Sequence, residues 1–146
     1  MAVTALLDVN VLIALAWPNH VHHGAARRWF TVHRGDGWAT CPLTEAGFVR
    51  VSCNPSAVRH KVTPREAIAL LQRLRQLEPH AFWALDCSVT DLPQQIVSRL
   101  QGYRQITDAV LLAAAIQRGE VLATLDSGLA RLVDERERHS VRVIPV

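Results

Sequence analysis

Residues 3–17 read VTALLDVNVLIALAW, an apolar stretch with Asp8 near its centre. The run before the acid, Val3 to Leu7, is too short for a helix and predicts a buried strand. The run after it, Val9 to Trp17, predicts a helix that stops before Pro18, because proline cannot continue a helix. The chain therefore opens with a strand that passes through one acidic residue into a helix.

The same alternation of strand and helix continues to the end of the chain. Further apolar runs predict strands at residues 38–41, 81–85, 121–125 and 141–144. Amphipathic runs predict helices at residues 20–34, 42–54, 63–77, 92–100 and 108–117. Thr63 and Glu66 form a capping box at the start of the fourth helix. Thr107 is expected to cap the last helix, and Gly119 to end it.

Continuous apolar strands that alternate with helices predict an α/β fold, with a central, mostly parallel sheet of five strands and helices on both faces. No shift in composition, linker or internal repeat divides the chain, and 146 residues fit one domain. We therefore expect a single domain over residues 1–146.

The composition excludes intrinsic disorder and points weakly to an anionic partner. Hydrophobic residues make up 49% of the chain and charged residues 20%, as in globular proteins. The formal charge is +3, and Lys61 is the only lysine among 16 Lys and Arg. Because the planar guanidinium of arginine suits phosphate, a polyanion is a reasonable partner.

The cysteines and the apolar runs bear on the cellular compartment. Cys41, Cys53 and Cys87 are odd in number and show no C-x-x-C spacing, which disfavours a disulfide framework or a structural zinc site. No run approaches the ~18–20 apolar residues that a membrane span needs. We expect a cytoplasmic protein that does not bind membranes.

Four acidic residues occupy the ends of predicted strands or the starts of predicted helices. Asp8 follows the first strand, and Asp126 follows the fourth. Glu45 lies near the start of the helix after the second strand, and Asp108 begins the helix before the fourth. Ligands of parallel α/β sheets bind outside the carboxyl ends of the strands, so these carboxylates are candidates for one site.

Grouped carboxylates repel one another unless a cation lies between them. Mg²⁺ or Mn²⁺ suits such a group, because these hard ions take oxygen ligands, keep several waters and bridge to phosphate. A plainer interpretation is that Glu45 and Asp108 only complement helix dipoles. That interpretation does not explain Asp8, since an acid between two apolar runs is costly to bury without a partner.

Four short motifs, in this order along the chain, resemble the PIN domain and more closely the VapC-type toxins of bacterial toxin–antitoxin pairs. They are LLDVNVLIAL at 6–15, TEAGFVR at 44–50, ITDAVLLAAA at 106–115 and LATLD at 122–126. The resemblance implies a PIN-like α/β/α sandwich and a metal-dependent endoribonuclease. Its catalytic acids would be Asp8, Glu45, Asp108 and Asp126.

The resemblance also implies how these acids work. Asp8 and Asp108 would be the principal ligands of Mg²⁺ or Mn²⁺, and Glu45 and Asp126 would complete the site directly or through water. A water activated by the metal would cleave single-stranded or loop RNA and leave a 5′-phosphate.

Other residues and partners follow from the same resemblance. Asn10 and Thr124 would orient the acids by hydrogen bonds. Arg50 and Arg104 lie near the acidic motifs and are candidates for contacts with RNA phosphates or with an antitoxin. The expected partners are the RNA substrate, a cognate VapB-like antitoxin and a second copy of the chain in a homodimer.

Two other functions stay open. A phosphatase-like hydrolase with an aspartate nucleophile could share Asp8, although such enzymes have a second aspartate where this chain has Asn10. A non-catalytic RNA-binding or scaffold protein could share the whole fold, and its affinity for RNA would survive chelation of metal. His20, His22 and His23 are expected to lie at a helix entry rather than to bind zinc.

Overall fold

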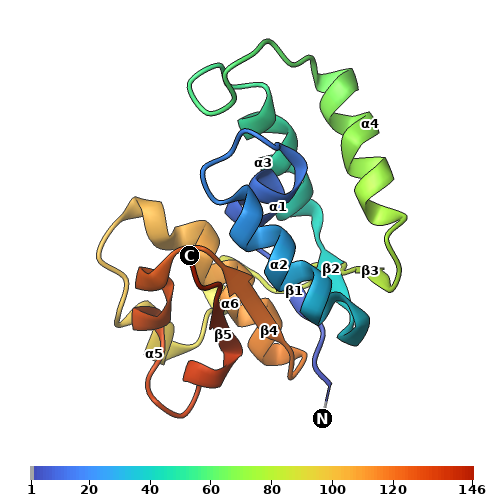
Figure 1. Ribbon diagram of the computed structural model, residues 1–146. Coiled ribbons are helices and arrows are strands. Elements are labelled where there is room, and N and C mark those ends of the chain that lie inside the picture. The colour runs from blue at the N-terminus through green and yellow to red at the C-terminus, as the bar shows by residue number, and fades with distance from the viewer. Residues whose placement is uncertain (1) are drawn as a thin grey trace.

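The computed structural model describes residues 2–146, and a single five-stranded sheet forms its centre (Figure 1). The strands lie in the order β3-β2-β1-β4-β5, and all four neighbouring pairs are parallel. Their bounds are β1 Ala5–Leu7, β2 Trp38–Thr40, β3 His80–Phe82, β4 Val121–Thr124 and β5 Val141–Val143. The predicted parallel α/β sheet of five strands is confirmed.

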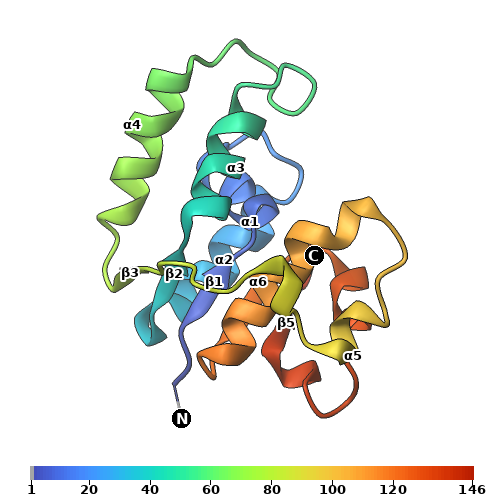
Figure 2. The same ribbon diagram turned by 180° about the vertical axis from the view of Figure 1, so that it is seen from behind.

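Helices cover both faces of the sheet. Their bounds are α1 Val9–Ala16, α2 His23–His33, α3 Pro42–Ser52, α4 Pro64–Arg75, α5 Gln94–Val97 and α6 Ile106–Gln117. Short 3-10 segments are η1 Arg34–Asp36, η2 Val89–Asp91, η3 Tyr103–Gln105, η4 Ser127–Leu132 and η5 Arg138–Ser140. Figures 1 and 2 show α4 beside α3, on the side of the molecule opposite α5. None of the helices within residues 2–146 is long and apolar enough to cross a membrane.

The central strand β1 divides the core in two, because side chains of a strand alternate between its faces. Leu6 packs into a cluster with α5, α6 and the segment after β4. Ala5 and Leu7 pack into a second cluster with α1, α2 and α3. Burial on both faces is the reason that β1 and β4 are uninterrupted apolar sequences rather than alternating ones.

Several boundaries follow the signals in the sequence. The capping box of α4 is present: the Glu66 amide donates to Thr63 Oγ1 at 3.2 Å, and the Thr63 amide donates to Glu66 Oε1 at 3.3 Å. Gly119 has a φ of 67°, a left-handed conformation that glycine adopts without strain and that ends α6. These boundaries are fixed by local chemistry, so a sequence can predict them.

Two predicted helix boundaries are wrong. Thr107 does not cap α6, because the 3-10 segment η3 leads directly into the helix and Gln105 takes the N-cap position. The helix predicted at 92–100 is reduced to the four residues of α5. Leu92 precedes Pro93 and adopts extended backbone with a ψ of 141°, the conformation that proline imposes on its predecessor.

The third strand lies earlier than the predicted 81–85. In the structure His80 pairs with Trp38, and Phe82 pairs with Thr40, the last residue of β2. Since β3 is at the edge of the sheet and has β2 as its one neighbour, the length of β2 limits it.

Candidate active site

The carboxyl ends of β1 and β4 bring Asp8 and Thr124 into direct contact. Leu7 of β1 pairs with Ala123 of β4, so the residues that follow them lie side by side. Thr124 Oγ1 donates to Asp8 Oδ2 at 2.8 Å, and the Val9 amide donates to Asp8 Oδ1 at 2.7 Å. Asp8 is only 6% exposed, so these donors compensate both oxygens of a buried carboxylate.

Thr124 also connects Asp8 to the next acid along the sheet edge. Its Oγ1 accepts the Asp126 amide at 3.0 Å and the Asn10 side-chain amide at 3.3 Å. Asn10 Oδ1 in turn accepts the Leu125 amide at 3.1 Å. Of the two residues predicted to orient the acids, Thr124 therefore bridges Asp8 and the backbone of Asp126, and Asn10 bonds to Thr124 and to the backbone of Leu125.

Asp108, in the first turn of α6, is half-buried and interacts with the charges of Asp8 and Asp126. Burial first, and then those two charges, raise the pKa of Asp108 to about 6. Burial also raises the pKa of Asp8; the hydrogen bonds from Thr124 and Val9 oppose this rise, and the Asp126 charge adds to it. Asp8, Asp108 and Asp126 thus form one electrostatic group, called the aspartate cluster below.

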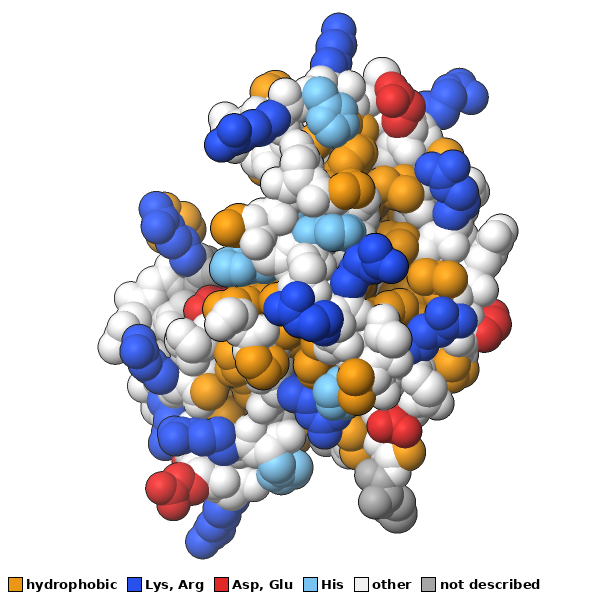
Figure 3. Space-filling model, viewed as in Figure 1, with side chains coloured by type: hydrophobic (Ala, Val, Ile, Leu, Met, Phe, Trp, Pro, Cys, Tyr) orange, Lys and Arg blue, Asp and Glu red, His pale blue; other side chains and the backbone are white. Residues whose placement is uncertain are grey.

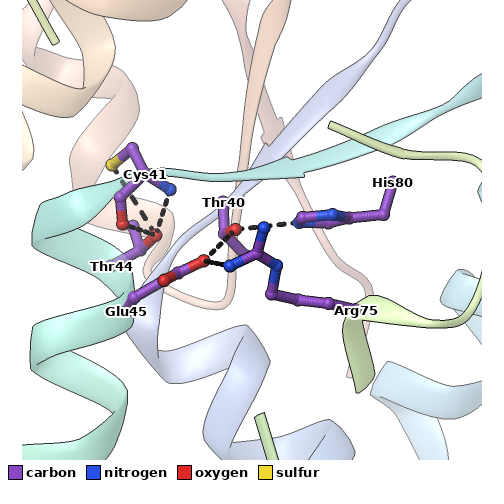
Figure 4. A network of polar contacts seen from close by, with 6 residues as sticks. All are labelled: Thr40, Cys41, Thr44, Glu45, Arg75 and His80. Atoms are coloured by element: carbon purple, nitrogen blue, oxygen red, sulfur yellow. Dashed lines mark hydrogen bonds and ion pairs between the residues drawn. The ribbon is translucent and has the colours of Figure 1, made fainter. Parts of the chain in front are cut away.

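Glu45, the fourth predicted acid, belongs to a different set of contacts (Figure 4). Its Oε2 accepts a hydrogen bond from Thr40 Oγ1 at 2.7 Å and lies 3.2 Å from Arg75 Nη1. Glu45 is not among the charges that raise the pKa of Asp8 or Asp108. The structure therefore couples the charges of Asp8, Asp108 and Asp126, and it pairs Glu45 with an arginine of α4.

The aspartate cluster suits a hydrated divalent ion better than a dehydrated one. Within residues 2–146, no three carboxylate, imidazole or thiol groups lie close enough together to hold one ion directly. Mg²⁺ needs no such cage, because it is commonly bound through one or two carboxylates and keeps several waters. Asp108 makes no hydrogen bond or ion pair within the described residues, so its oxygens are free to serve such an ion.

Gly47 allows α3 to approach α1 closely beside Asp8. A Cβ at this position would lie 2.6 Å from Val9 Cγ2, closer than real carbon atoms approach. The Val9 backbone amide donates to Asp8, so a displacement of this backbone would disturb the buried carboxylate. The glycine of the TEAGFVR motif is therefore explained by packing next to the site.

A pocket of about 300 Å³ opens beside the aspartate cluster and contains positive charge that the sequence motifs do not indicate. Asp108 and Asp126 line it together with Arg99 and Arg131. Both arginines are exposed, and neither forms an ion pair within residues 2–146. Arg131 follows Asp126 by only five residues, a proximity that the sequence does show. Arg99 gives no such signal, because the fold alone brings the end of α5 to the pocket.

Neither of the two arginines predicted to contact phosphate lines this pocket. Arg50 is exposed in the last turn of α3, at the end away from Glu45. Arg104 is exposed in η3, just before the turn of α6 that carries Asp108, and its guanidinium lies 5.7 Å from the centre of the Tyr103 ring. Figure 3 shows Lys and Arg side chains spread over one face of the molecule rather than gathered in one patch.

The three histidines lie at the entry of α2, as predicted. The His22 amide donates to His20 Nδ1 at 3.0 Å, and His23 Nδ1 lies 2.7 Å from the carbonyl oxygen of Ala14 in α1. The contact of His23 connects the start of α2 to α1.

The raised pKa of Asp108 predicts that metal binding and stability depend on pH. Below about pH 6 the Asp108 carboxyl is mostly protonated, so a cation must displace this proton in order to bind. Without metal, the folded protein disfavours the ionised form, so its stability falls as the pH rises from 3.8 to about 6. We expect Mn²⁺ at about 100 times its Kd to add about 2.7 kcal/mol to the free energy of unfolding at pH 7.5. At pH 5 about a tenth of the Asp108 carboxyls are ionised, so the same Mn²⁺ concentration should add only about 1.4 kcal/mol.

Thermal unfolding with and without Mn²⁺ at the two pH values measures this dependence. Mg²⁺ serves as a second ion, and Ca²⁺ tests whether the effect depends on ion size. An equal stabilisation by Mn²⁺ at pH 5 and pH 7.5 would show that Asp108 is not a ligand.

Known proteins resemble this chain in sequence and in fold. The profile of the PIN domain family matches residues 5–135. Ribonuclease VapC38 of Mycobacterium tuberculosis is 46% identical to this chain, and the alignment covers 97% of this chain and 99% of VapC38. Ribonuclease VapC39 of the same species is 49% identical, over 87% of this chain and 91% of VapC39.

Two crystal structures are similar to the fold. One is VapC20 of Mycobacterium tuberculosis, described as a sarcin-ricin loop cleaving toxin, with a TM-score of 0.63 and 14% identity over 85% of this chain and 90% of VapC20. The other is PAE2754 from Pyrobaculum aerophilum, with a TM-score of 0.62 and 22% identity over 98% of this chain and 85% of PAE2754. At these identities the likeness concerns the fold alone.

Proposed function

The chain belongs to the PIN domain family, in its group of VapC ribonucleases, and on this premise we propose that it hydrolyses RNA with the help of a hydrated Mg²⁺ or Mn²⁺ ion. Asp8, Asp108 and Asp126 would hold the ion, directly or through its waters. The observation that carries the proposal is Asp108, a half-buried carboxylate that has two like charges near it and no protein partner within residues 2–146. A cation would relieve this repulsion.

The chain's own residues would supply orientation and charge. A bound Mg²⁺ or Mn²⁺ ion lowers the pKa of a water, so that it can attack phosphorus, and offsets charge on the phosphate oxygens. Thr124 and the Val9 amide fix the direction of the Asp8 carboxylate. Glu45 would act from the β2 side through water, since its Oε2 is already bonded to two donors. No side chain needs to act as the nucleophile.

The position of Asn10 disfavours the phosphatase-like alternative. A second aspartate in that place would have to offer a free carboxyl to the substrate. The Asn10 amide is instead bonded on both sides, to Thr124 and to the backbone of Leu125. Its role is to support the end of β4.

We further propose that Arg99 and Arg131 bind phosphates of the RNA next to the scissile bond. They share a pocket with Asp108 and Asp126, and their guanidinium groups have no carboxylate partner within the described part of the chain. Replacing either arginine by glutamine should weaken binding of single-stranded RNA several-fold. It should also lower the slope of log K against log salt by about 0.7 for each phosphate that the protein no longer neutralises.

Fluorescence anisotropy in EDTA measures this binding without cleavage. Arg136→Gln is the matched control, because Arg136 is exposed and precedes the start of β5, whereas the aspartate cluster lies at the carboxyl ends of the strands. If Arg99→Gln and Arg131→Gln both keep the wild-type affinity for RNA and the wild-type salt slope, the pocket is not a phosphate site. The same titration with Arg50→Gln and Arg104→Gln would test the two arginines proposed from the sequence.

The proposed partners follow from the VapC group. We propose that a small VapB-like antitoxin binds the protein and masks the site, and that the chain forms a homodimer in the cytoplasm. Expression alone should arrest growth, and co-expression with the antitoxin should relieve the arrest; unaffected growth would count against a toxin. Sedimentation as a strict monomer would refute the dimer.

Incubation of the purified protein with total cellular RNA tests the proposed function. We expect cleavage with Mn²⁺ or Mg²⁺ and none in EDTA. Asp8→Asn should bind RNA without cleaving it. RNA binding by the wild-type protein without any cleavage would favour the scaffold alternative.

A further inference from the structure

Glu45 is the centre of a network that connects four elements (Figure 4). Thr40 ends β2, Glu45 lies in the first turn of α3, Arg75 ends α4 and His80 begins β3. The single ion pair within residues 2–146 is the one between Arg75 and Glu45. The Arg75 guanidinium also lies 5.3 Å from the centre of the Phe82 ring. Arg75 is therefore held from two sides, although its side chain is 40% exposed.

The hydrogen bonds of this network all run toward Glu45. The one hydroxyl proton of Thr40 is donated to Glu45 Oε2 at 2.7 Å. Thr40 Oγ1 can then only accept from His80 Nε2, which lies 2.8 Å away, so this assigns the proton of the neutral imidazole to Nε2. Glu45 thus receives two interactions. One is the hydrogen bond from Thr40, which itself accepts from His80, and the other is the ion pair with Arg75.

The acids of the site consequently fall into two groups, one at the ends of β1 and β4 and the other at the end of β2. The aspartate cluster lies at β1, β4 and α6; besides burial, the Asp8 and Asp126 charges raise the pKa of Asp108, and the Asp126 charge raises that of Asp8. Glu45 lies at β2, and the charge that it contacts is the positive charge of Arg75. Because an ion pair lowers the free energy of a carboxylate where it stands, Arg75 opposes any movement of Glu45 toward the aspartate cluster.

We propose that Arg75 is a positioning residue of the nuclease, which pairs with Glu45 and keeps this carboxylate out of the ligand set of the metal. This inference rests on the proposed function. Three aspartates would then determine the affinity for the ion, and Glu45 would remain available to a water or to the RNA beside it. Removal of Arg75 would release a fourth negative charge that can approach the ion.

Titration calorimetry with Mn²⁺ alone tests the role of Arg75 without any measurement of activity. Arg75→Gln should bind Mn²⁺ at least about threefold more tightly than the wild-type protein. A change of this size in Kd corresponds to the free energy of a partly exposed ion pair. Arg75→Lys keeps the charge and should retain wild-type affinity. Arg73→Gln is the matched control, because Arg73 is exposed on the same helix and has no carboxylate partner within residues 2–146.

A double-mutant cycle separates this role from a general effect of charge. Glu45→Gln alone should change Mn²⁺ affinity by less than about twofold, and it should cancel the gain in Arg75→Gln/Glu45→Gln. A gain that persists in the double variant, or an unchanged affinity in Arg75→Gln, would overturn the inference. A large loss in Glu45→Gln would also overturn it, since Glu45 would then be a direct ligand. A wild-type protein that binds no Mn²⁺ would instead refute the metal site and the inference together.

Discussion

Asp108→Asn should abolish RNA cleavage and leave the protein folded. The amide has the shape of the carboxylate but no charge, and Asp108 has no protein partner within residues 2–146 to lose. We expect activity to fall by about 100-fold or more, since even a residue that only supports a metal ligand typically contributes about 10–100-fold. Cleavage of a defined RNA in Mn²⁺ measures the loss, and calorimetry should show weaker binding of Mn²⁺.

The same variant should make the metal-free protein more stable at neutral pH. The ionised Asp108 is disfavoured in the folded state, since burial and the charges of Asp8 and Asp126 raise its pKa to about 6. After allowance for screening by solvent, the gain in the free energy of unfolding should be on the order of 1 kcal/mol at pH 7.5. The gain should vanish below about pH 4, where the folded and unfolded carboxyls are both protonated.

These opposite effects of one substitution distinguish a functional residue from a structural one. Asp91→Asn is a suitable control, because Asp91 is exposed in η2 and lines a pocket with Gln117 at the far end of α6 from Asp108. If Asp108→Asn lowers the free energy of unfolding as well as the activity, the carboxylate has a structural role instead.

Thr124→Val should lower both the stability and the activity of the protein. The hydroxyl of Thr124 is fully buried and bonds to Asp8, to the Asn10 amide and to the backbone of Asp126. Valine keeps the shape but leaves a buried carboxylate without one of its donors. We expect a loss of about 1.5–3 kcal/mol in the free energy of unfolding. Activity should also fall by about 10–100-fold, because Asp8 loses its orientation.

Thr124→Ser provides the control for this prediction. Serine retains the hydroxyl and loses one buried methyl group, so its activity should stay close to that of the wild-type protein. Urea denaturation and cleavage rates of the two variants give the comparison. Equal activity in Thr124→Val and Thr124→Ser would show that the hydroxyl does not orient Asp8.

The parts of this fold that the sequence predicts are those governed by local chemistry or by strand periodicity. The apolar run before Asp8 and the one before Asp126 predict buried parallel strands, and neighbouring strands place these acids at one edge. The capping box at Thr63 and the glycine at position 119 fix helix ends for the same local reason.

The features that the sequence does not predict depend on tertiary packing. Arg75 is thirty positions from Glu45, and only the packing of α4 against α3 joins them. The pocket that combines Arg99 with Asp126 likewise requires the end of α5 to meet the start of η4. The positions of strand ends predict Glu45 beside the aspartates, and they give no sign that this carboxylate pairs with Arg75.

The chemistry of the RNA ends distinguishes hydrolysis by a metal-activated water from attack by the RNA's own 2′-hydroxyl. A water activated by a metal ion at the aspartate cluster should leave a 5′-phosphate and a 3′-hydroxyl at every cut. Sequencing of RNA 5′ ends by a ligation that requires a 5′-phosphate, with Asp8→Asn as the blank, should detect the cuts of the wild-type protein and none in the variant. Cuts that carry a 5′-hydroxyl and a 2′,3′-cyclic phosphate would mean that the RNA's own 2′-hydroxyl is the nucleophile, and would contradict this account.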